Sequence, residues 1–144
     1  MADWDARYLE KAQQVSEWSK DPSTRTGAVI VSPYNRIVAV GFNGFPPGIA
    51  DDERLSNREL KYEIIIHCEV NALVSAAQDV HGFTLYTWPF ASCSRCAAIM
   101  LGAGITRFVF PPLPDHLVER WGNNIDTTKA LFAEAGVIFN EWHT

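Results

Sequence analysis

The chain has 144 residues, of which 47% are hydrophobic and 20% are charged, and its formal net charge is −5 at pH 7. This length and balance predict a single soluble globular domain over residues 1–144, without room for a second core of ordinary size. The acidic charge argues against a long nucleic acid as partner, because non-specific binding to its backbone depends on Lys and Arg. A mononucleotide stays possible, since one or two local basic groups can hold a single phosphate.

Nothing in the sequence indicates a targeting or membrane segment. Residues 1–5 are acidic and the residues after them are amphipathic, unlike a signal peptide. No apolar run approaches the roughly 18 residues of a membrane span. We therefore expect a cytoplasmic protein with no membrane partner. In that compartment Cys68, Cys93 and Cys96 are expected to be thiols or metal ligands, not disulfides.

The first half of the chain predicts a helix, a hairpin and a long loop. Apolar residues at helical spacing predict a helix from about Asp3 to Lys20, which Pro22 ends. Gly27–Val31 is a short apolar run and Arg36–Phe42 returns after turn residues, so the two predict an antiparallel hairpin. Residues 43–58 are rich in Gly, Pro and acidic side chains, and we expect them to form a loop.

The second half of the chain alternates predicted helices with predicted strands. Helices are expected at 69–78, 94–101 and 126–135, and strands at 83–88, 106–110 and 137–142. Such alternation indicates parallel strand pairing. The fold class is therefore expected to be α/β, with one mixed sheet of about five strands sandwiched by helices.

Three potential metal ligands lie in two short clusters, His67 in the first and Cys93 with Cys96 in the second. Cysteines three apart at the start of a helix lie on one face, so both sulfurs can reach a single ion. Zinc suits this mixture of sulfur and imidazole donors, and three protein ligands leave one coordination position open, as in catalytic zinc sites. Water at such a position becomes a nucleophile near neutral pH.

Glu69 is the candidate that moves protons at this site. It lies two residues after His67, a separation that points side chains apart on an ideal helix. The two can act together only if His67 stands at or near the start of its helix, with the metal beyond the helix end. As a proton carrier Glu69 would contribute roughly 10²–10⁴-fold to the rate.

Each of these features has a plainer explanation when taken alone. A Cys-x-x-Cys pair can be redox-active or half of a structural site, a His after three isoleucines can be a core residue, and Glu69 can simply complement a helix dipole. A closed structural zinc would need Cys68 or His81 as fourth ligand. The joint occurrence, with 25 residues between His67 and Cys93, favours the catalytic interpretation.

The two clusters are similar to H-x-E followed by P-C-x-x-C, the signature of zinc-dependent nucleobase deaminases. Further stretches resemble the deoxycytidylate (dCMP) deaminases within the cytidine deaminase superfamily. These stretches are Trp18–Ser23, Gly27–Val31, Gly41–Gly48 and Gly102–Ile105. The resemblance covers the chain from about Trp4 to Val137 and implies a three-layer α/β/α fold, one catalytic zinc per chain and a homo-oligomer. It also implies that the substrate is a small nucleotide, dCMP, which is hydrolysed to dUMP with release of ammonia.

The same resemblance implies roles for four further residues. Asn43 would contact the substrate sugar, and Arg25 would lie near the phosphate, although a solvated charge beside the hairpin explains Arg25 equally well. Trp88 and Phe90 would wall the base pocket by stacking, although aromatic residues at a strand end also fit the core.

Three departures from the family pattern bear on the substrate. Cys68 stands where alanine is usual, Ser92 stands where proline precedes the first cysteine, and Phe42 replaces a tyrosine. Proline would restrict the backbone before the site. None of the changes removes a ligand or Glu69. They leave open another amino-heterocycle as substrate, such as a free base, a nucleoside or a damaged pyrimidine. A zinc module that binds a nucleotide without catalysis is the alternative from a different class.

Overall fold

A computed structural model describes residues 3–143 and contains one mixed sheet with the strand order β2-β1-β3-β4-β5. The strands are β1 (Gly27–Val31), β2 (Ile37–Phe42), β3 (Thr84–Trp88), β4 (Arg107–Phe110) and β5 (Ile138–Glu141). β1 pairs in antiparallel fashion with β2 and β3, whereas β4 runs parallel to β3 and β5. The expected five-stranded mixed sheet is confirmed, with the hairpin at one edge and the parallel strands at the other.

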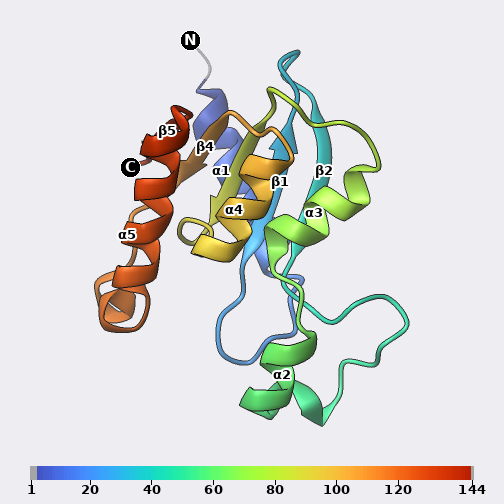
Figure 1. Cartoon of the computed structure of the whole chain (residues 1–144). Coiled ribbons are helices and arrows are strands. Elements are labelled where there is room, and N and C mark those ends of the chain that lie inside the picture. The colour runs from blue at the N-terminus through green and yellow to red at the C-terminus, as the bar shows by residue number, and fades with distance from the viewer. Residues whose placement is uncertain (1–2, 144) are drawn as a thin grey trace.

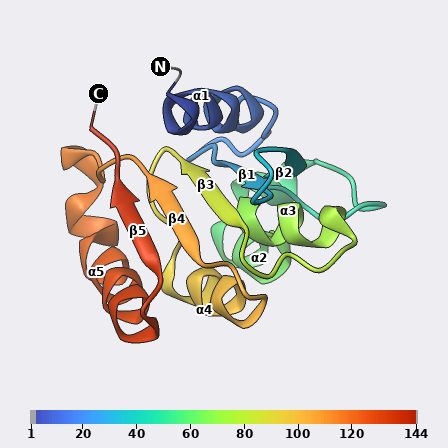
Figure 2. The same ribbon diagram turned by 90° about the horizontal axis from the view of Figure 1, so that it is seen from above.

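Helices cover both faces of this sheet in three layers (Figure 2). They are α1 (Trp4–Ser16), α2 (Arg58–Ile64), α3 (Cys68–Ala76), α4 (Ser94–Gly102) and α5 (Val118–Ala135). α1 packs on one face, and α3, α4 and α5 pack on the other (Figure 2). α2 lies beyond one end of the sheet (Figure 1). None of these helices is long and apolar enough to cross a membrane.

The core has two parts because the side chains of each strand alternate between the faces. On the α1 face, Leu9 and Ala12 pack with Val29 of β1. On the other face, Ile30 packs in a larger cluster with Phe108 and with buried residues of α3, α4 and α5. All five residues of β1 are buried, as expected for a continuous apolar run covered on both sides.

The predicted loop at 43–58 was only partly right. It contains a 3₁₀ turn, Glu53–Ser56, and α2 begins at its end and finishes three residues before His67. α2 is seven residues long, too short for hydrophobic periodicity to reveal. Its local signal is Asn57, whose side-chain Oδ1 accepts a hydrogen bond from the backbone N–H of Leu60 at 3.2 Å, as helix N-caps do.

Two predicted helix ends were also wrong. The first helix ends at Ser16 and not at Lys20, although turns continue to Trp18. The last helix begins at Val118, eight residues before the predicted start at 126. Gly122 and two asparagines lie in this added stretch, and residues of such low helix propensity conceal a helix that tertiary packing supports.

Candidate active site

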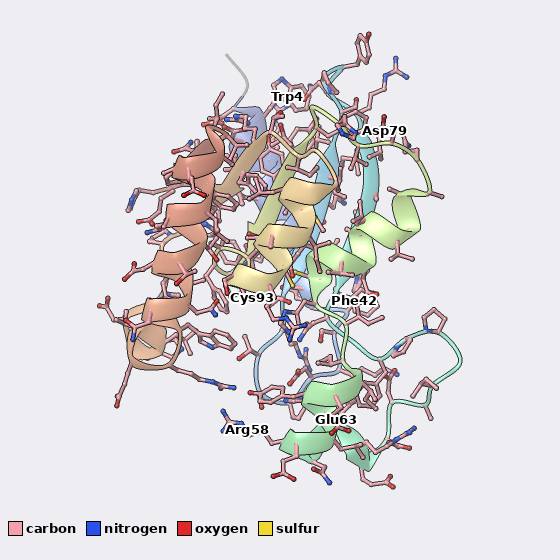
Figure 3. All side chains as sticks on the ribbon, viewed as in Figure 1. Trp4, Phe42, Arg58, Glu63, Asp79 and Cys93 are labelled. Carbon is pink, nitrogen blue, oxygen red and sulfur yellow. The ribbon has the colours of Figure 1, made fainter. Side chains whose placement is uncertain are left out.

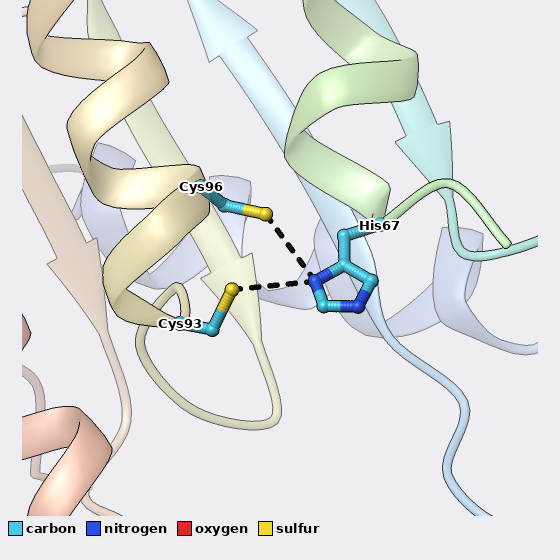
Figure 4. Close-up of side chains that lie close together, drawn as sticks. All are labelled: His67, Cys93 and Cys96. Carbon is cyan, nitrogen blue, oxygen red and sulfur yellow. Dashed lines mark hydrogen bonds between the residues drawn. The ribbon is translucent and has the colours of Figure 1, made fainter. Parts of the chain in front are cut away.

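The candidate metal ligands come from the N-termini of two neighbouring helices. His67 is the N-cap of α3, Cys93 is the N-cap of α4, and Cys96 lies in the first turn of α4. Figure 4 shows the two sulfurs pointing at the imidazole. The expected position of His67 at the start of its helix is confirmed. The arrangement keeps the donor atoms beyond the helix ends, where the helix dipoles stabilise thiolates.

The β2 strand and the residues that follow it fix the start of α3 through two close backbone contacts. The segment before His67 forms an antiparallel bridge in which the N–H groups of Gly44 and Ile66 donate to each other's carbonyls at 3.1 and 2.8 Å. Gly41 of β2 lies so close to α3 that a β-carbon there would be 2.4 Å from the backbone of Cys68 and Ala72. Any larger residue at this position would push α3, and with it His67, away from the sheet.

The distances among the three ligand atoms fit a tetrahedral zinc ion. His67 Nδ1 lies 3.4 Å from Cys93 Sγ and 3.2 Å from Cys96 Sγ, and all three atoms lie within 4.8 Å of one another. Zinc bonds of about 2.3 Å to sulfur and about 2.0–2.1 Å to nitrogen, at tetrahedral angles, separate N from S by about 3.5 Å. The sulfur and imidazole donors and their spacing therefore fit zinc.

Cys93 and Cys96 share one proton through a hydrogen bond, and a bound cation would take the place of that proton. A hydrogen bond from Cys96 lowers the pKa of Cys93 to about 4. The same bond with Cys93 raises the pKa of Cys96 well above its ordinary value. The hydrogen bond with Cys93 also raises the pKa of His67. A divalent cation at this point would substitute for the shared proton and hold both sulfurs as thiolates.

Glu69 lies beside this group and is 3% exposed, and it lines the same cavity as His67 and Cys93. Its carboxylate is therefore not turned toward bulk solvent. Within residues 3–143, neither alternative ligand joins the three-atom group. Cys68 is buried with a pKa raised by desolvation, so it is a thiol, and His81 is an exposed residue that contacts Asp79.

Aromatic side chains form the walls of the cavity. Trp88 and Phe90 line it, and so does Trp121 from the early part of α5. The rings of Phe90 and Trp121 have centroids 6.3 Å apart. Trp121 lies in the cavity wall, whereas Trp142 packs against the core cluster under α1.

Asn43 lines the cavity and also holds one of its sides in place. The Asn43 side chain accepts a hydrogen bond from the backbone N–H of Thr26 at 2.9 Å. Its Nδ2 donates to the carbonyl of Thr24 at 2.8 Å and to Asp21 at 3.3 Å. Both amide protons are thus used within the protein, and one lone pair of Oδ1 is left to accept a further hydrogen bond.

Cationic side chains lie at the end of the cavity toward α2. Lys61 is buried, and its Nζ donates to Asp21 at 3.1 Å and to Ser23 at 3.3 Å. Arg120, from the start of α5, donates to the hydroxyl of Tyr62. Lys61, Tyr62 and Arg120 all line the cavity.

Arg58 lines an adjoining polar pocket that shares these three residues. In Figure 3, Cys93 marks the end of α4 that faces the Arg58 segment. Arg25 is exposed and is not among the residues that line either pocket.

Residues 2–111 match the family described as cytidine and deoxycytidylate deaminase zinc-binding region. The chain belongs to this deaminase family. It is 40% identical to the "uncharacterized deaminase in luxG 3′region" of Aliivibrio fischeri, over 93% of this chain and 90% of the relative. It is 34% identical to the deoxycytidylate deaminase of Mus musculus, over 97% of this chain and 80% of the relative.

Solved structures of other deaminases share the fold. The dCMP deaminase of the cyanophage S-TIM5, crystallised with dCMP and dUMP, superposes with a TM-score of 0.75 at 23% identity, over 95% of both chains. The Rib2 deaminase of Aspergillus oryzae superposes with a TM-score of 0.66 at 15% identity, over 99% of this chain and 85% of that one. These likenesses confirm the cytidine deaminase-like α/β fold.

The cavity residues to which sequence reasoning about this deaminase gave no role at the site include Lys61, Tyr62, Arg120 and Trp121. Lys61 and Tyr62 belong to the short α2, which begins where the predicted loop ends, in a stretch for which no element was predicted. Arg120 and Trp121 belong to the part of α5 that low helix propensity concealed. No local motif marks them, because they meet the candidate ligands only when α2 and α5 come together at the end of the sheet.

Proposed function

We propose that this protein hydrolyses dCMP to dUMP and ammonia with one zinc ion per chain. The observation that carries the proposal is one cavity with two chemically different ends. One end has the His/Cys/Cys group and a buried carboxylate, and the other has cationic side chains. The family match and the relatives named deoxycytidylate deaminase support this substrate.

His67, Cys93 and Cys96 would hold the zinc ion. When bound, zinc supplies a Lewis-acid centre that makes a water molecule nucleophilic near neutral pH. The ligands' place at the helix starts keeps them fixed relative to Glu69, because both helices pack on the same face of the sheet. Such preorganisation removes the need to assemble the site during each turnover.

Glu69 would carry the protons of the reaction. A bond forms between the water oxygen and C4 of the cytosine ring, and Glu69 takes a proton from that water and passes it to ring nitrogen N3. The second proton of the same oxygen then goes through Glu69 to the amino group as the C4–N bond breaks, so that ammonia leaves and the oxygen remains as the 4-carbonyl of uracil. The buried position of Glu69 limits the loss of these protons to bulk water.

The walls of the cavity would orient the nucleoside part of the substrate. Trp88, Phe90 and Trp121 offer aromatic surfaces on which a pyrimidine can stack. The free lone pair on Asn43 Oδ1 can accept a hydrogen bond from a sugar hydroxyl. Because both Nδ2 protons are engaged with Thr24 and Asp21, Asn43 would act toward the sugar as an acceptor only.

The cationic end would bind the 5′-phosphate. Lys61 Nζ has three N–H donors, and Asp21 and Ser23 accept from it, which leaves a donor for a phosphate oxygen. Arg120 lies at the same end and adds a planar guanidinium suited to phosphate. Arg25, which the resemblance favours for this role, is the alternative at the start of β1.

A substrate panel tests this proposal directly. The zinc-loaded protein is incubated with dCMP, deoxycytidine and cytosine, and ammonia release is measured. We expect turnover of dCMP with a kcat/KM at least about tenfold above that of deoxycytidine, because one charge-assisted contact is worth about 1.5–3 kcal/mol. If dCMP is inert while a phosphate-free base or nucleoside is deaminated, the protein acts on another amino-heterocycle and the proposal fails.

A further inference from the structure

Two of the residues that depart from the family pattern contact the same oxygen of Glu69. The hydroxyl of Ser92 donates to Glu69 Oε2 at 2.8 Å, and the thiol of Cys68 donates to this oxygen at 3.5 Å. All three side chains are buried, with exposed fractions of 3–5%. The departures at 68 and 92 are therefore not independent, because both act on the proton carrier.

The contact from Ser92 is the stronger of the two. A separation of 2.8 Å is typical of a full O–H···O hydrogen bond, whereas a thiol is a weak donor. The residues of the family pattern provide neither contact, since alanine has no donor and proline has no hydroxyl. This chain thus has a side-chain restraint on Glu69 that the pattern lacks.

Ser92 is itself held in place by α5. Its carbonyl accepts a hydrogen bond from the hydroxyl of Thr128 at 2.8 Å, and Thr128 is fully buried. Two residues later, the N–H of Ser94 donates to Asn124 Oδ1 at 2.9 Å. These bonds anchor the segment before α4 where a proline would otherwise restrict it, so the Ser92 hydroxyl is presented to Glu69 from a fixed position.

We propose that Ser92 is a positioning residue that fixes the orientation of the Glu69 carboxylate in the reaction. Ser92 and Cys68 both reach Oε2, so neither occupies Oε1, which is left to exchange protons with the water, the ring nitrogen and the departing amine. Proton transfer depends steeply on distance and direction, so a carboxylate free to rotate spends less time in the reactive geometry. This inference rests on the proposed deamination.

Ser92→Ala and Ser92→Thr test the inference, with Ser94→Ala as the matched control. Ser94 also has a hydroxyl in this segment, but its partner is Asn124 and not Glu69. We expect Ser92→Ala to lower kcat about tenfold, the equivalent of one hydrogen bond, while KM changes less than about twofold. Ser92→Thr, which keeps a hydroxyl, is expected to regain most of the lost kcat, and Ser94→Ala to keep the parent value. Zinc content and Tm are measured for every variant.

Two results would overturn the inference. One is a kcat for Ser92→Ala within about twofold of the parent when zinc content and Tm are unchanged. The other is a crystal structure of the parent protein in which the Ser92 hydroxyl lies more than about 3.5 Å from Glu69, a separation that leaves no hydrogen bond. This second test does not depend on whether a variant folds. If the parent deaminates nothing in the substrate panel, the proposed function fails, whereas the crystal structure still tests the contact.

Discussion

The two ends of the cavity are built in different ways. At the inner end, the three candidate ligands and Glu69 lie at the starts of α3 and α4, which pack on the sheet. At the outer end, the exposed side chains of Tyr62 and Arg120 line the cavity beside the buried Lys61, on α2 and the start of α5, beyond the end of the sheet (Figure 1).

This difference matches the demands on the two ends. Proton transfer needs atoms held to fractions of an ångström, and helix starts packed on a sheet provide that precision. Recognition of a phosphate tolerates longer, more mobile side chains. Substitutions in the outer elements should therefore leave the candidate ligands undisturbed, and substitutions at the two ends should change different kinetic constants.

Removal of a metal ligand should have the largest effect. Cys96→Ala deletes one of two sulfurs, and we expect it to lose zinc and to reduce ammonia release to background. Cys68→Ala is the control, because Cys68 lies outside the ligand group and its loss should leave about one zinc per chain. Metal analysis of both purified variants measures this. Full zinc occupancy in Cys96→Ala would contradict the assigned ligand set.

Glu69→Gln should separate zinc binding from catalysis. The amide keeps the size of the side chain but cannot carry protons, so we expect kcat to fall roughly 10²–10⁴-fold while zinc content stays at the parent level. Steady-state ammonia release and metal analysis measure the two quantities. Parent and variant proteins that bind dCMP equally and both release no ammonia would indicate a non-catalytic nucleotide-binding module.

Arg120→Ala should weaken binding at the outer end only. We expect its KM for dCMP to rise about tenfold, the loss of one charge-assisted contact, with kcat little changed. Deoxycytidine has no phosphate and should show no such rise. Arg25→Ala is the matched comparison, because Arg25 is exposed and lies outside the cavity lining. If Arg25→Ala raises KM for dCMP and Arg120→Ala does not, the phosphate binds near the start of β1.

Asp5→Asn should change stability alone, since Asp5 lies in the first turn of α1 and lines neither end of the cavity. Arg107 donates to its two oxygens at 2.9 and 2.5 Å, and Tyr86 donates at 2.6 Å. We expect the variant to lose roughly 1–2 kcal/mol of unfolding free energy at pH 7, or about 3–6 °C in Tm, with kcat and KM unchanged. A change in either kinetic constant would show that the α1 face is coupled to the cavity.

The pH dependence of this loss has a definite sign. The hydrogen bond with Arg107 lowers the pKa of Asp5 below its ordinary value of 3.8 in the folded protein. The stabilisation is therefore complete above the unfolded pKa and disappears as the pH falls through the lower folded value. The difference between parent and variant should shrink in unfolding experiments below about pH 4. A difference that grows on acidification would contradict the pairing with Arg107.

The sequence by itself determined the features that depend on local spacing. Cysteines three apart and a histidine two residues before a glutamate indicated the candidate ligands and the candidate proton carrier Glu69. Apolar runs bounded by turn residues indicated the five strands. These signals are local because helix and strand periodicity set which neighbouring side chains share a face. The same rule failed for α2, which is only seven residues long, and for the start of α5, where residues of low propensity interrupt the pattern.

Only the tertiary structure decided which distant residues meet at the cavity. Lys61 reaches Asp21 across 40 positions of sequence, and Ser92 reaches Glu69 across 23. Such contacts form because packing on the sheet buries polar groups together, and a buried donor or charge requires a partner. No local pattern encodes that requirement, so the cationic end and the restraint on Glu69 became visible only in the folded chain.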